Sequence, residues 1–260
     1  MIAREKWKEV TRDRFKRSYA DRHCPVVLEE VCNLPAVEKW IDFDYFLSVG
    51  IPKDKYVDVS VSEATFSGEI SNHMEMRIRF EECIETMKRR CDAKGETKRR
   101  RNALRYYLCQ CPLSREKDET NRETLPNLFR DVTTPPFLSS MDEVTSINLW
   151  CAGDAVTSSL HYDENHNILI VTRGHKRVKL YNPSRTEIEP NGVHSNSGNH
   201  ARLRTKDIKP DFIVDIFPRT ALFIPEGWYH EVESASGTFC SIDREYQSRI
   251  THSHKQVRSH

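Results

Sequence analysis

The most informative part of the sequence is Ser158-Ser159-Leu160-His161-Tyr162-Asp163-Glu164-Asn165-His166-Asn167, followed closely by Gly174-His175-Lys176. Alternate side chains of an extended strand point to the same face, so the pattern predicts that His161, Asp163 and Asn167 look toward one interior. A histidine and a carboxylate one residue apart provide two ligands of a two-histidine, one-carboxylate metal face. The segment from Ala221 to His230 ends in the candidate for the missing histidine.

The segment from Lys176 to Tyr181 alternates as well, and Val178 and Leu180 mark its apolar face. Lys176 shares that face. An unpaired ammonium group on a buried face is very costly, so this lysine requires an anion. The sequence therefore predicts a metal triad of the kind that suits non-haem Fe(II), with a buried cation beside it.

A lone His-x-Asp pair arises often by chance, but here it belongs to an ordered series. An asparagine, Gly-x-Lys and an apolar-Ile-Pro-x-x-Trp-x-His segment follow it before the chain reaches His230. In this order the chain resembles the jumonji C (cupin-like) family of Fe(II)- and 2-oxoglutarate-dependent oxygenases, from about Pro25 to about Cys240. The part from Leu160 to Pro183 is similar to the hydroxylase branch, which includes the factor-inhibiting-HIF-type protein hydroxylases and the tRNA wybutosine hydroxylase.

The resemblance implies a mainly β fold: a double-stranded β-helix, also called a jelly-roll or cupin barrel, with an N-terminal α/β extension. A polar C-terminal tail without strand alternation or a helical stripe is expected to be disordered. We therefore expect an N-terminal charged helix in residues 1–24 and the N-terminal α/β part of the jumonji C domain in 25–105. The barrel follows in 106–242 and the disordered tail in 243–260.

The resemblance also assigns roles to residues. It implies that Fe(II) is held by His161, Asp163 and His230, which leave three positions for 2-oxoglutarate and O2. Lys176 is expected to pair with the distal carboxylate of 2-oxoglutarate and to dominate its binding, because charge-assisted hydrogen bonds are about twice as strong as neutral ones. The other residues implied at the cosubstrate are Tyr107, Ser158 and Asn167.

Each of these three residues also has a purely structural interpretation. Tyr107 is equally explained as a barrel-core tyrosine bonded to backbone, Ser158 as an ordinary strand serine and Asn167 as a turn cap. Trp228 stands two residues before His230, so it is expected to share the face of that histidine and to wall the pocket.

The loop from Glu187 to Lys209 is rich in Gly, Asn, Ser and His, and loops of this length are usually functional or disordered. It contains His194 and His200. No carboxylate or cysteine pattern accompanies them, so both are expected to be solvated. The same expectation holds for His252 and His254 in the tail.

The N-terminal part shows three local patterns. Ala3 to His23 is charged and places Trp7, Val10 and Phe15 on one helical stripe, which predicts a surface helix. The segment Pro25 to Leu28 and the alternating valines 57, 59 and 61 predict strands. Phe80, Cys83, Ile84 and Met87 fit the buried face of a helix.

Composition limits the setting. The formal net charge of the 260 residues is +1, so no global field favours a nucleic acid or a membrane. The eight cysteines lack a disulfide-scaffold rhythm and are expected to be free thiols. The first residues lack the apolar core of a secretory signal, and no run approaches the roughly 20 apolar residues of a membrane helix. We expect a protein of the cytoplasm or nucleus that does not enter a membrane.

The most basic stretch runs from Lys88 to Arg101. It is explained either as a nuclear-localisation or RNA-contacting patch, or as a solvated helix end and loop. It carries no aromatic residue for stacking on bases. The stretch mildly favours nucleic acid or chromatin, whereas a protein substrate is the expected partner of the leading hypothesis; the oligomeric state is left open.

The sequence thus predicts an Fe(II)- and 2-oxoglutarate-dependent dioxygenase that hydroxylates a protein side chain. Within the same family, a tRNA-base hydroxylase or a histone lysine demethylase is the alternative. A non-catalytic cupin-like binding module is the alternative from another class, because the last barrel strand looks incomplete. After Cys240 the family continues with an apolar strand holding an asparagine and aromatics, whereas this chain reads Ser241-Ile242-Asp243-Arg244-Glu245-Tyr246.

Overall fold

The structure is a computed structural model that describes residues 1–62, 65–66, 74–92, 104–114, 125–191, 198–201, 208–235 and 239–246. The larger of its two sheets contains β1 (Ala3–Lys6), β2 (Val26–Glu29), β3 (Tyr56–Ser62), β5 (Met74–Arg79), β6 (Arg105–Ser114), β7 (Val144–Ala152), β9 (His166–Arg173), β12 (Thr220–Ile224) and β14 (Phe239–Tyr246). The smaller sheet contains β4 (Thr65–Phe66), β8 (Val156–Tyr162), β10 (Lys176–Tyr181), β11 (Phe212–Ile216) and β13 (Tyr229–Ser234).

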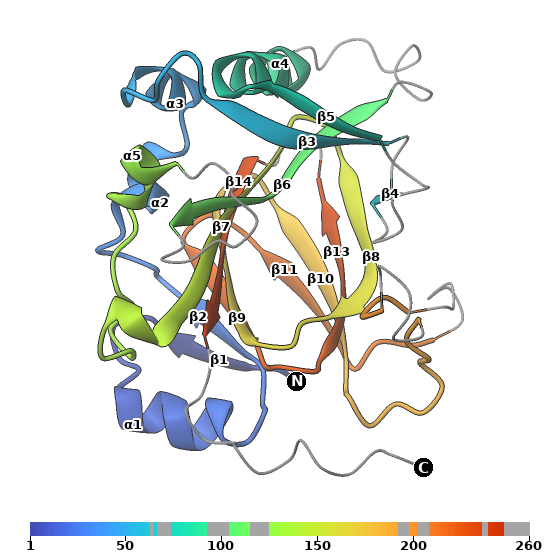
Figure 1. Ribbon diagram of the computed structural model, residues 1–260. Coiled ribbons are helices and arrows are strands. Elements are labelled where there is room, and N and C mark those ends of the chain that lie inside the picture. Colours follow the sequence, from blue (N-terminus) through green and yellow to red (C-terminus); the bar gives the residue numbers. More distant parts are fainter. Residues whose placement is uncertain are drawn as a thin grey trace.

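The strand order is that of a barrel made by two sheets. It runs β1-β2-β12-β9-β14-β7-β6-β3-β5 in the larger sheet and β11-β10-β13-β8-β4 in the smaller one (Figure 1). The strands pair antiparallel except for β1 with β2 and β4 with β8. The predicted mainly β jelly-roll fold is confirmed.

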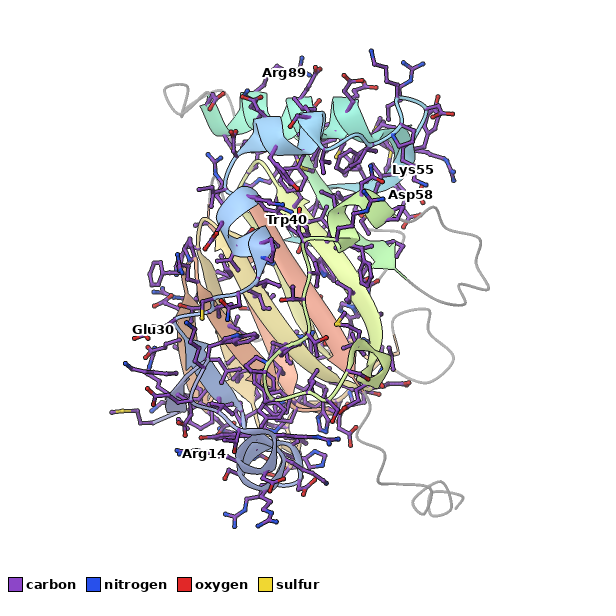
Figure 2. The ribbon with its side chains drawn as sticks, turned by 90° about the vertical axis from the view of Figure 1, so that its left-hand side faces the viewer. Arg14, Glu30, Trp40, Lys55, Asp58 and Arg89 are labelled. Atoms are coloured by element: carbon purple, nitrogen blue, oxygen red, sulfur yellow. The ribbon has the colours of Figure 1, made fainter. Side chains whose placement is uncertain are left out.

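Helices and turns cover the outer face of the larger sheet. They are α1 (Arg12–Phe15), a π-helical turn (Lys16–Ala20), α2 (Pro35–Lys39), α3 (Phe43–Ser48), α4 (Phe80–Asp92), α5 (Pro126–Phe129) and a 3-10 turn (Met141–Glu143). Arg14 on α1 and Arg89 on α4 mark two opposite ends of the molecule (Figure 2). Among the residues described, no helix combines the length and apolar character that crossing a membrane requires.

Two apolar cores lie on the two faces of β9. Ile168 and Ile170 belong to the core beneath the helices, whereas Leu169 and Val171 belong to the core inside the barrel. A strand buried on both faces has a continuous apolar run instead of an alternating one, and His166–Arg173 has this character. Burying each such side chain contributes about 1.5–3 kcal/mol.

The N-terminal segment differs from the predicted surface helix of residues 1–24. Ala3–Lys6 forms β1 parallel to β2, and the first helix begins only after Thr11, whose side chain caps it. Trp7 is 3% exposed and meets Phe137 edge-on, with 5.0 Å between ring centroids. The apolar residues of the N-terminal segment therefore pack in the core. The segment begins as a strand because the edge of β2 offers it backbone hydrogen-bond partners, which the local sequence pattern does not reveal.

The C-terminal strand corrects a second prediction. β14 pairs with β9 and with β7 from Phe239 or Ser241 to Tyr246, so its backbone completes the larger sheet. The barrel does not end at residue 242, and residues 243–246 are not a disordered tail. A strand between two neighbours satisfies its backbone groups on both edges whatever its side chains are, so weak alternation is a poor guide there. Residues 247–260 lie outside the described part.

His166 begins β9 and is 1% exposed. Its Nδ1 accepts a hydrogen bond from the Glu226 amide at 3.0 Å, and its ring contacts those of Phe223 and His23 at 5.5 and 5.4 Å. Burial, followed by the neighbouring His23, lowers the pKa of His166 to about 4. The folded protein thus keeps this imidazole neutral.

The first prediction concerns this titration. The unfolded chain takes up the proton near pH 6.5 and the folded chain only near pH 4. The His166 contribution to stability is therefore intact above pH 6.5 and is lost as pH falls toward 4, with a slope of about 1.4 kcal/mol per pH unit. His166→Asn keeps an acceptor near Nδ1, so urea unfolding between pH 4 and 7 should show a slope smaller by up to that amount. Equal slopes in both proteins would contradict the assignment.

Candidate metal centre

The three predicted ligands meet at one end of the smaller sheet. His161 on β8 lies opposite His230 on β13, and Asp163 follows in the turn after β8. One ligand atom from each of the three lies within 4.8 Å of the others. The rings of His161 and His230 are 4.2 Å apart between centroids, and His230 Nε2 is 3.6 Å from Asp163 Oδ2. The predicted convergence of two distant segments is therefore present.

Backbone carbonyls fix the orientation of both imidazoles. His161 Nδ1 lies 2.7 Å from the Ser159 carbonyl oxygen, and His230 Nδ1 lies 3.0 Å from that of Trp228. A carbonyl oxygen only accepts, so each Nδ1 carries the proton and donates it. The lone pair is left on Nε2 in both rings, which is the form that ligates a metal.

Asp163 is held by two further contacts. Asn167 Nδ2 donates to Asp163 Oδ2 at 3.1 Å, and the Gly227 amide donates to the Asp163 carbonyl oxygen at 2.9 Å. Gly227 has φ +77°, a left-handed conformation that glycine adopts without steric cost. The turn before β13 thus fixes the backbone of a ligand on the other segment.

The protonation states of Asp163 and His230 are those that bind a metal cation. Burial acts to raise the pKa of Asp163, but His230, His161 and the hydrogen bond from Asn167 outweigh it and lower that pKa. Burial, followed by repulsion from His161, lowers the pKa of His230 to about 4. At neutral pH the site therefore presents a carboxylate and neutral imidazole, as metal binding requires.

The barrel interior buries a lysine and several polar atoms. Lys176 is 4% exposed, and its Nζ lies 6.0 Å from the centroid of the Trp150 ring. Trp150 Nε1, Asn148 Oδ1 and Asn167 Oδ1 are buried and make no hydrogen bond to the residues described. A buried polar atom left without a partner costs about 1–3 kcal/mol. An interior with these groups is suited to a polar ligand that carries both donors and acceptors.

Tyr107 and Ser158 lie on the strands around this interior. Tyr107 is 3% exposed, and its ring contacts those of Phe66 and Trp150 at 5.0 and 5.7 Å. Ser158 on β8 lies opposite Val232 on β13. The position of Ser158 is compatible with its predicted role at the cosubstrate. Asn167, the third residue of that prediction, donates a hydrogen bond to Asp163 and is thus a partner of the carboxylate ligand.

A β-bulge explains how Ser158 and His161 share a face. Residues three apart in a regular strand point to opposite faces. The register with β13 shifts between His230 and Val232, so His161 pairs with the first and Ser158 with the second. Because His230 and Val232 are two residues apart, both β8 residues join the same side. Alternation read from the sequence does not reveal this shift.

Trp228 is buried just before β13. Its indole Nε1 donates to the His23 carbonyl oxygen at 2.8 Å, and its ring stacks on Phe212 with 6.0 Å between centroids. It lines a cavity of about 390 Å³ together with N-terminal residues from Met1 to Ala3. It shares the apolar cluster inside the barrel with Val178 and Leu180, and its place in the wall of the cosubstrate pocket stays a prediction.

His200 is the residue that sequence analysis missed. The prediction that it is solvated is wrong: its ring stacks on that of His161, with 5.0 Å between centroids and 18° between planes, and its Nδ1 bonds Ser159 Oγ at 2.8 Å. No local motif marks this residue, since its place depends on the path of a long loop. His194, His252 and His254 lie outside the described residues.

Part of the basic stretch is engaged within the protein. Lys88 pairs with Asp44 at 2.5 Å, and Arg90 pairs with Asp154 at 2.5 Å. These contacts favour the structural interpretation for the helical end of the stretch. Residues 93–101 lie outside the described part.

Comparison with known proteins agrees with this geometry. The family model described as the cupin-like domain matches residues 12–252. Among curated relatives, the chain is 28% identical to lysine-specific demethylase JMJ31 of Arabidopsis thaliana (79% of this chain, 44% of that protein). It is 25% identical to Jumonji C domain-containing protein 5 of Drosophila melanogaster (82% and 52%) and 28% identical to tRNA wybutosine-synthesizing protein 5 of Gallus gallus (86% and 71%).

The fold and the triad define a cupin-type barrel with a candidate metal centre, and the chain belongs to the cupin-like domain family. Relatives named for jumonji C proteins agree with the resemblance found in the sequence. The chain spans about half the length of the first two of these relatives.

The second prediction tests the triad. Asp163→Ala removes the only carboxylate among the three ligands, so affinity for Co(II), a probe for divalent metal sites, should fall by at least about tenfold, the smallest effect expected even for an outer-shell residue. Glu164→Ala removes the exposed neighbouring carboxylate of the same turn and should bind Co(II) as the unmodified chain does. Isothermal titration calorimetry measures both. Equal loss in the two variants would argue for nonspecific attraction of the cation.

Proposed function

We propose that this chain is an Fe(II)- and 2-oxoglutarate-dependent dioxygenase that hydroxylates a protein side chain. The observation that carries the proposal is the triad of His161, Asp163 and His230, whose ligand atoms lie within 4.8 Å, at the mouth of a barrel that buries Lys176. A two-histidine, one-carboxylate face with open positions is the ligand set of non-haem Fe(II) oxygenases. When bound, Fe(II) with 2-oxoglutarate and O2 supplies the oxidation, which yields succinate, CO2 and an oxygen atom inserted into a substrate C–H bond.

The protein's own contribution is to bind and orient these groups. The backbone carbonyls of Ser159 and Trp228 hold the two imidazoles with Nε2 toward the metal. Asn167 holds the Asp163 carboxylate by its amide. The buried ammonium of Lys176 neutralises the distal carboxylate of 2-oxoglutarate, and the apolar walls around it exclude water from the cosubstrate.

Tyr107 and Ser158 complete the proposed cosubstrate pocket by donating hydrogen bonds to the same carboxylate. The orphaned indole N–H of Trp150, a residue that the sequence patterns did not mark, is a further donor for it. The last of these assignments gives the Trp150 N–H a partner that it lacks among the described residues.

A protein substrate is proposed in preference to nucleic acid, and the helical end of the basic stretch supports this choice. Two cations of the basic stretch, Lys88 and Arg90, are already paired with carboxylates, which leaves them less able to contact phosphates. The relative named tRNA wybutosine-synthesizing protein 5 supports tRNA-base hydroxylation as the second candidate, and those named lysine-specific demethylases support demethylation. For each of these substrates the cytoplasm or nucleus is the proposed location.

A non-catalytic binding module is the competing class. This alternative was based on a last barrel strand that looked incomplete in the sequence. In the structure β14 pairs with both neighbouring strands, β7 and β9, up to Tyr246. The tautomers fixed in the triad and the deprotonated carboxylate further favour metal chemistry over a bare pocket.

The third prediction concerns Lys176. Lys176→Ala should raise the concentration of 2-oxoglutarate needed for half-maximal succinate formation by about 10- to 100-fold, because hydrogen bonds to charged groups contribute about 1.5–3 kcal/mol. Lys179→Ala is the matched control: this lysine lies on the same strand but pairs with Glu231 and Glu233 at 2.6 and 2.5 Å. The control should leave that concentration unchanged. An unaltered requirement in Lys176→Ala would refute its role.

The fourth prediction concerns turnover and substrate class. With Fe(II) and 2-oxoglutarate, the chain should form succinate slowly alone and faster with its substrate. Mass spectrometry of proteins incubated with it should then reveal a gain of one oxygen, about 16 Da, on one peptide. Oxygen gained by a tRNA nucleoside, or methyl loss from histone peptides, would select the alternative substrates. If a folded chain that binds Co(II) forms no succinate, the non-catalytic binding module is the remaining hypothesis.

A further inference from the structure

A short piece of the long loop runs along the outer edge of β8. Residues 198–201 lie beside it: the Tyr162 amide donates to Asn199 O at 3.1 Å, and the Ala201 amide donates to Leu160 O at 2.9 Å. His200 forms a bridge with His161 between these two bonds. The Asn199 side chain adds a hydrogen bond to Tyr162 O at 2.9 Å. The piece therefore has a fixed register on the strand that carries a metal ligand.

The same piece is held from its other side. The Asn191 amide donates to the His200 carbonyl oxygen at 2.6 Å, and Pro190 forms a bridge with Ala201. Backbone contacts on two edges leave His200 little freedom to move along or away from β8. Its side chain is thus delivered to a defined place next to the site.

The place is defined by Ser159. The carbonyl oxygen of Ser159 accepts from His161 Nδ1, and its hydroxyl bonds His200 Nδ1. The two rings are 18° from parallel. The rings of His161 and His200 are nearly parallel, and both direct Nδ1 toward Ser159. Their Nε2 atoms therefore lie on the side away from Ser159. For His161 this is the side that faces the metal.

His200 is not itself one of the three ligands. It stands outside the set of ligand atoms that lie within 4.8 Å of one another.

We propose that His200 is a positioning residue for the metal centre: with Ser159 it fixes the ring plane of His161 and so the direction of the Nε2 lone pair. The proposal rests on the metal site of the proposed function but not on turnover. A ring held by one hydrogen bond can still rotate about that bond, and a flat neighbour stacked on it restricts this rotation. Partners of metal ligands typically affect metal affinity 10- to 100-fold.

The proposal has a consequence for the loop. Because 198–201 joins the loop of residues 187–209 to His161, a change in that loop reaches the metal through this stack.

The fifth prediction tests it with Co(II), whose visible d–d spectrum reports ligand geometry. His200→Ala should bind Co(II) on the order of 10-fold more weakly and shift the spectrum. Ser159→Ala, which removes the hydroxyl bonded to His200 but keeps the backbone carbonyl and the backbone contacts of residues 198–201, should shift the spectrum in the same sense. His200→Phe restores a flat ring without Nδ1 and should recover part of the affinity. His175→Ala, which removes a histidine stacked on Phe217 and bonded to Asp215, is the matched control and should bind as the unmodified chain does.

Circular dichroism and the melting temperature establish that each variant is folded. Wild-type affinity and spectrum in folded His200→Ala and Ser159→Ala would overturn the proposal. A loss in His200→Ala as complete as in His230→Ala would overturn it too, since His200 would then be a ligand. Normal Co(II) binding without succinate formation would instead count against the oxygenase function alone, and the dependence on His200 would still stand or fall by its own measurement.

Discussion

The register between β8 and β13 is the constraint on which the site depends. It places His161 opposite His230, and a bulge one step further along brings Ser158 to the same side. Backbone hydrogen bonds set this pairing, and a slip of one residue would turn each side chain to the other face. The turns at that end then lock together, because the Gly227 amide bonds the Asp163 carbonyl oxygen. The positions of the ligand side chains in the metal centre thus depend on the pairing register of β8 and β13.

How far the sequence predicted this follows from the range of the interactions. Short periodic patterns were sufficient for the buried face of Lys176 and for the strand that carries valines 57, 59 and 61, because burial repeats every second residue. The motif series and its resemblance supplied the triad. The parallel edge β1, the pairing of β14 and the stack of His200 on His161 depend on neighbours far along the chain, and no local periodicity encodes them.

The barrel interior carries polar groups at a cost to stability. Lys176 is buried, and Asn148, Trp150 and Asn167 each have a buried atom without a hydrogen bond among the described residues. An apolar interior of the same shape would fold more favourably, since unsatisfied buried groups destabilise a protein. The proposed cosubstrate would supply partners to the atoms of Asn148, Trp150 and Asn167 that lack them among the described residues, and its binding to the folded state would stabilise that state.

Two hydrogen bonds through Trp228 connect the N-terminal segment to one of the metal ligands. The indole of Trp228 is anchored to the His23 carbonyl oxygen, and the carbonyl of the same tryptophan accepts the proton of His230 Nδ1. A displacement of residues near His23 therefore moves the group that fixes the tautomer of a ligand. On the opposite flank, His200 ties the long loop to His161. The two imidazole ligands are thus oriented from two separate parts of the chain, so either part can alter the metal centre without touching the metal.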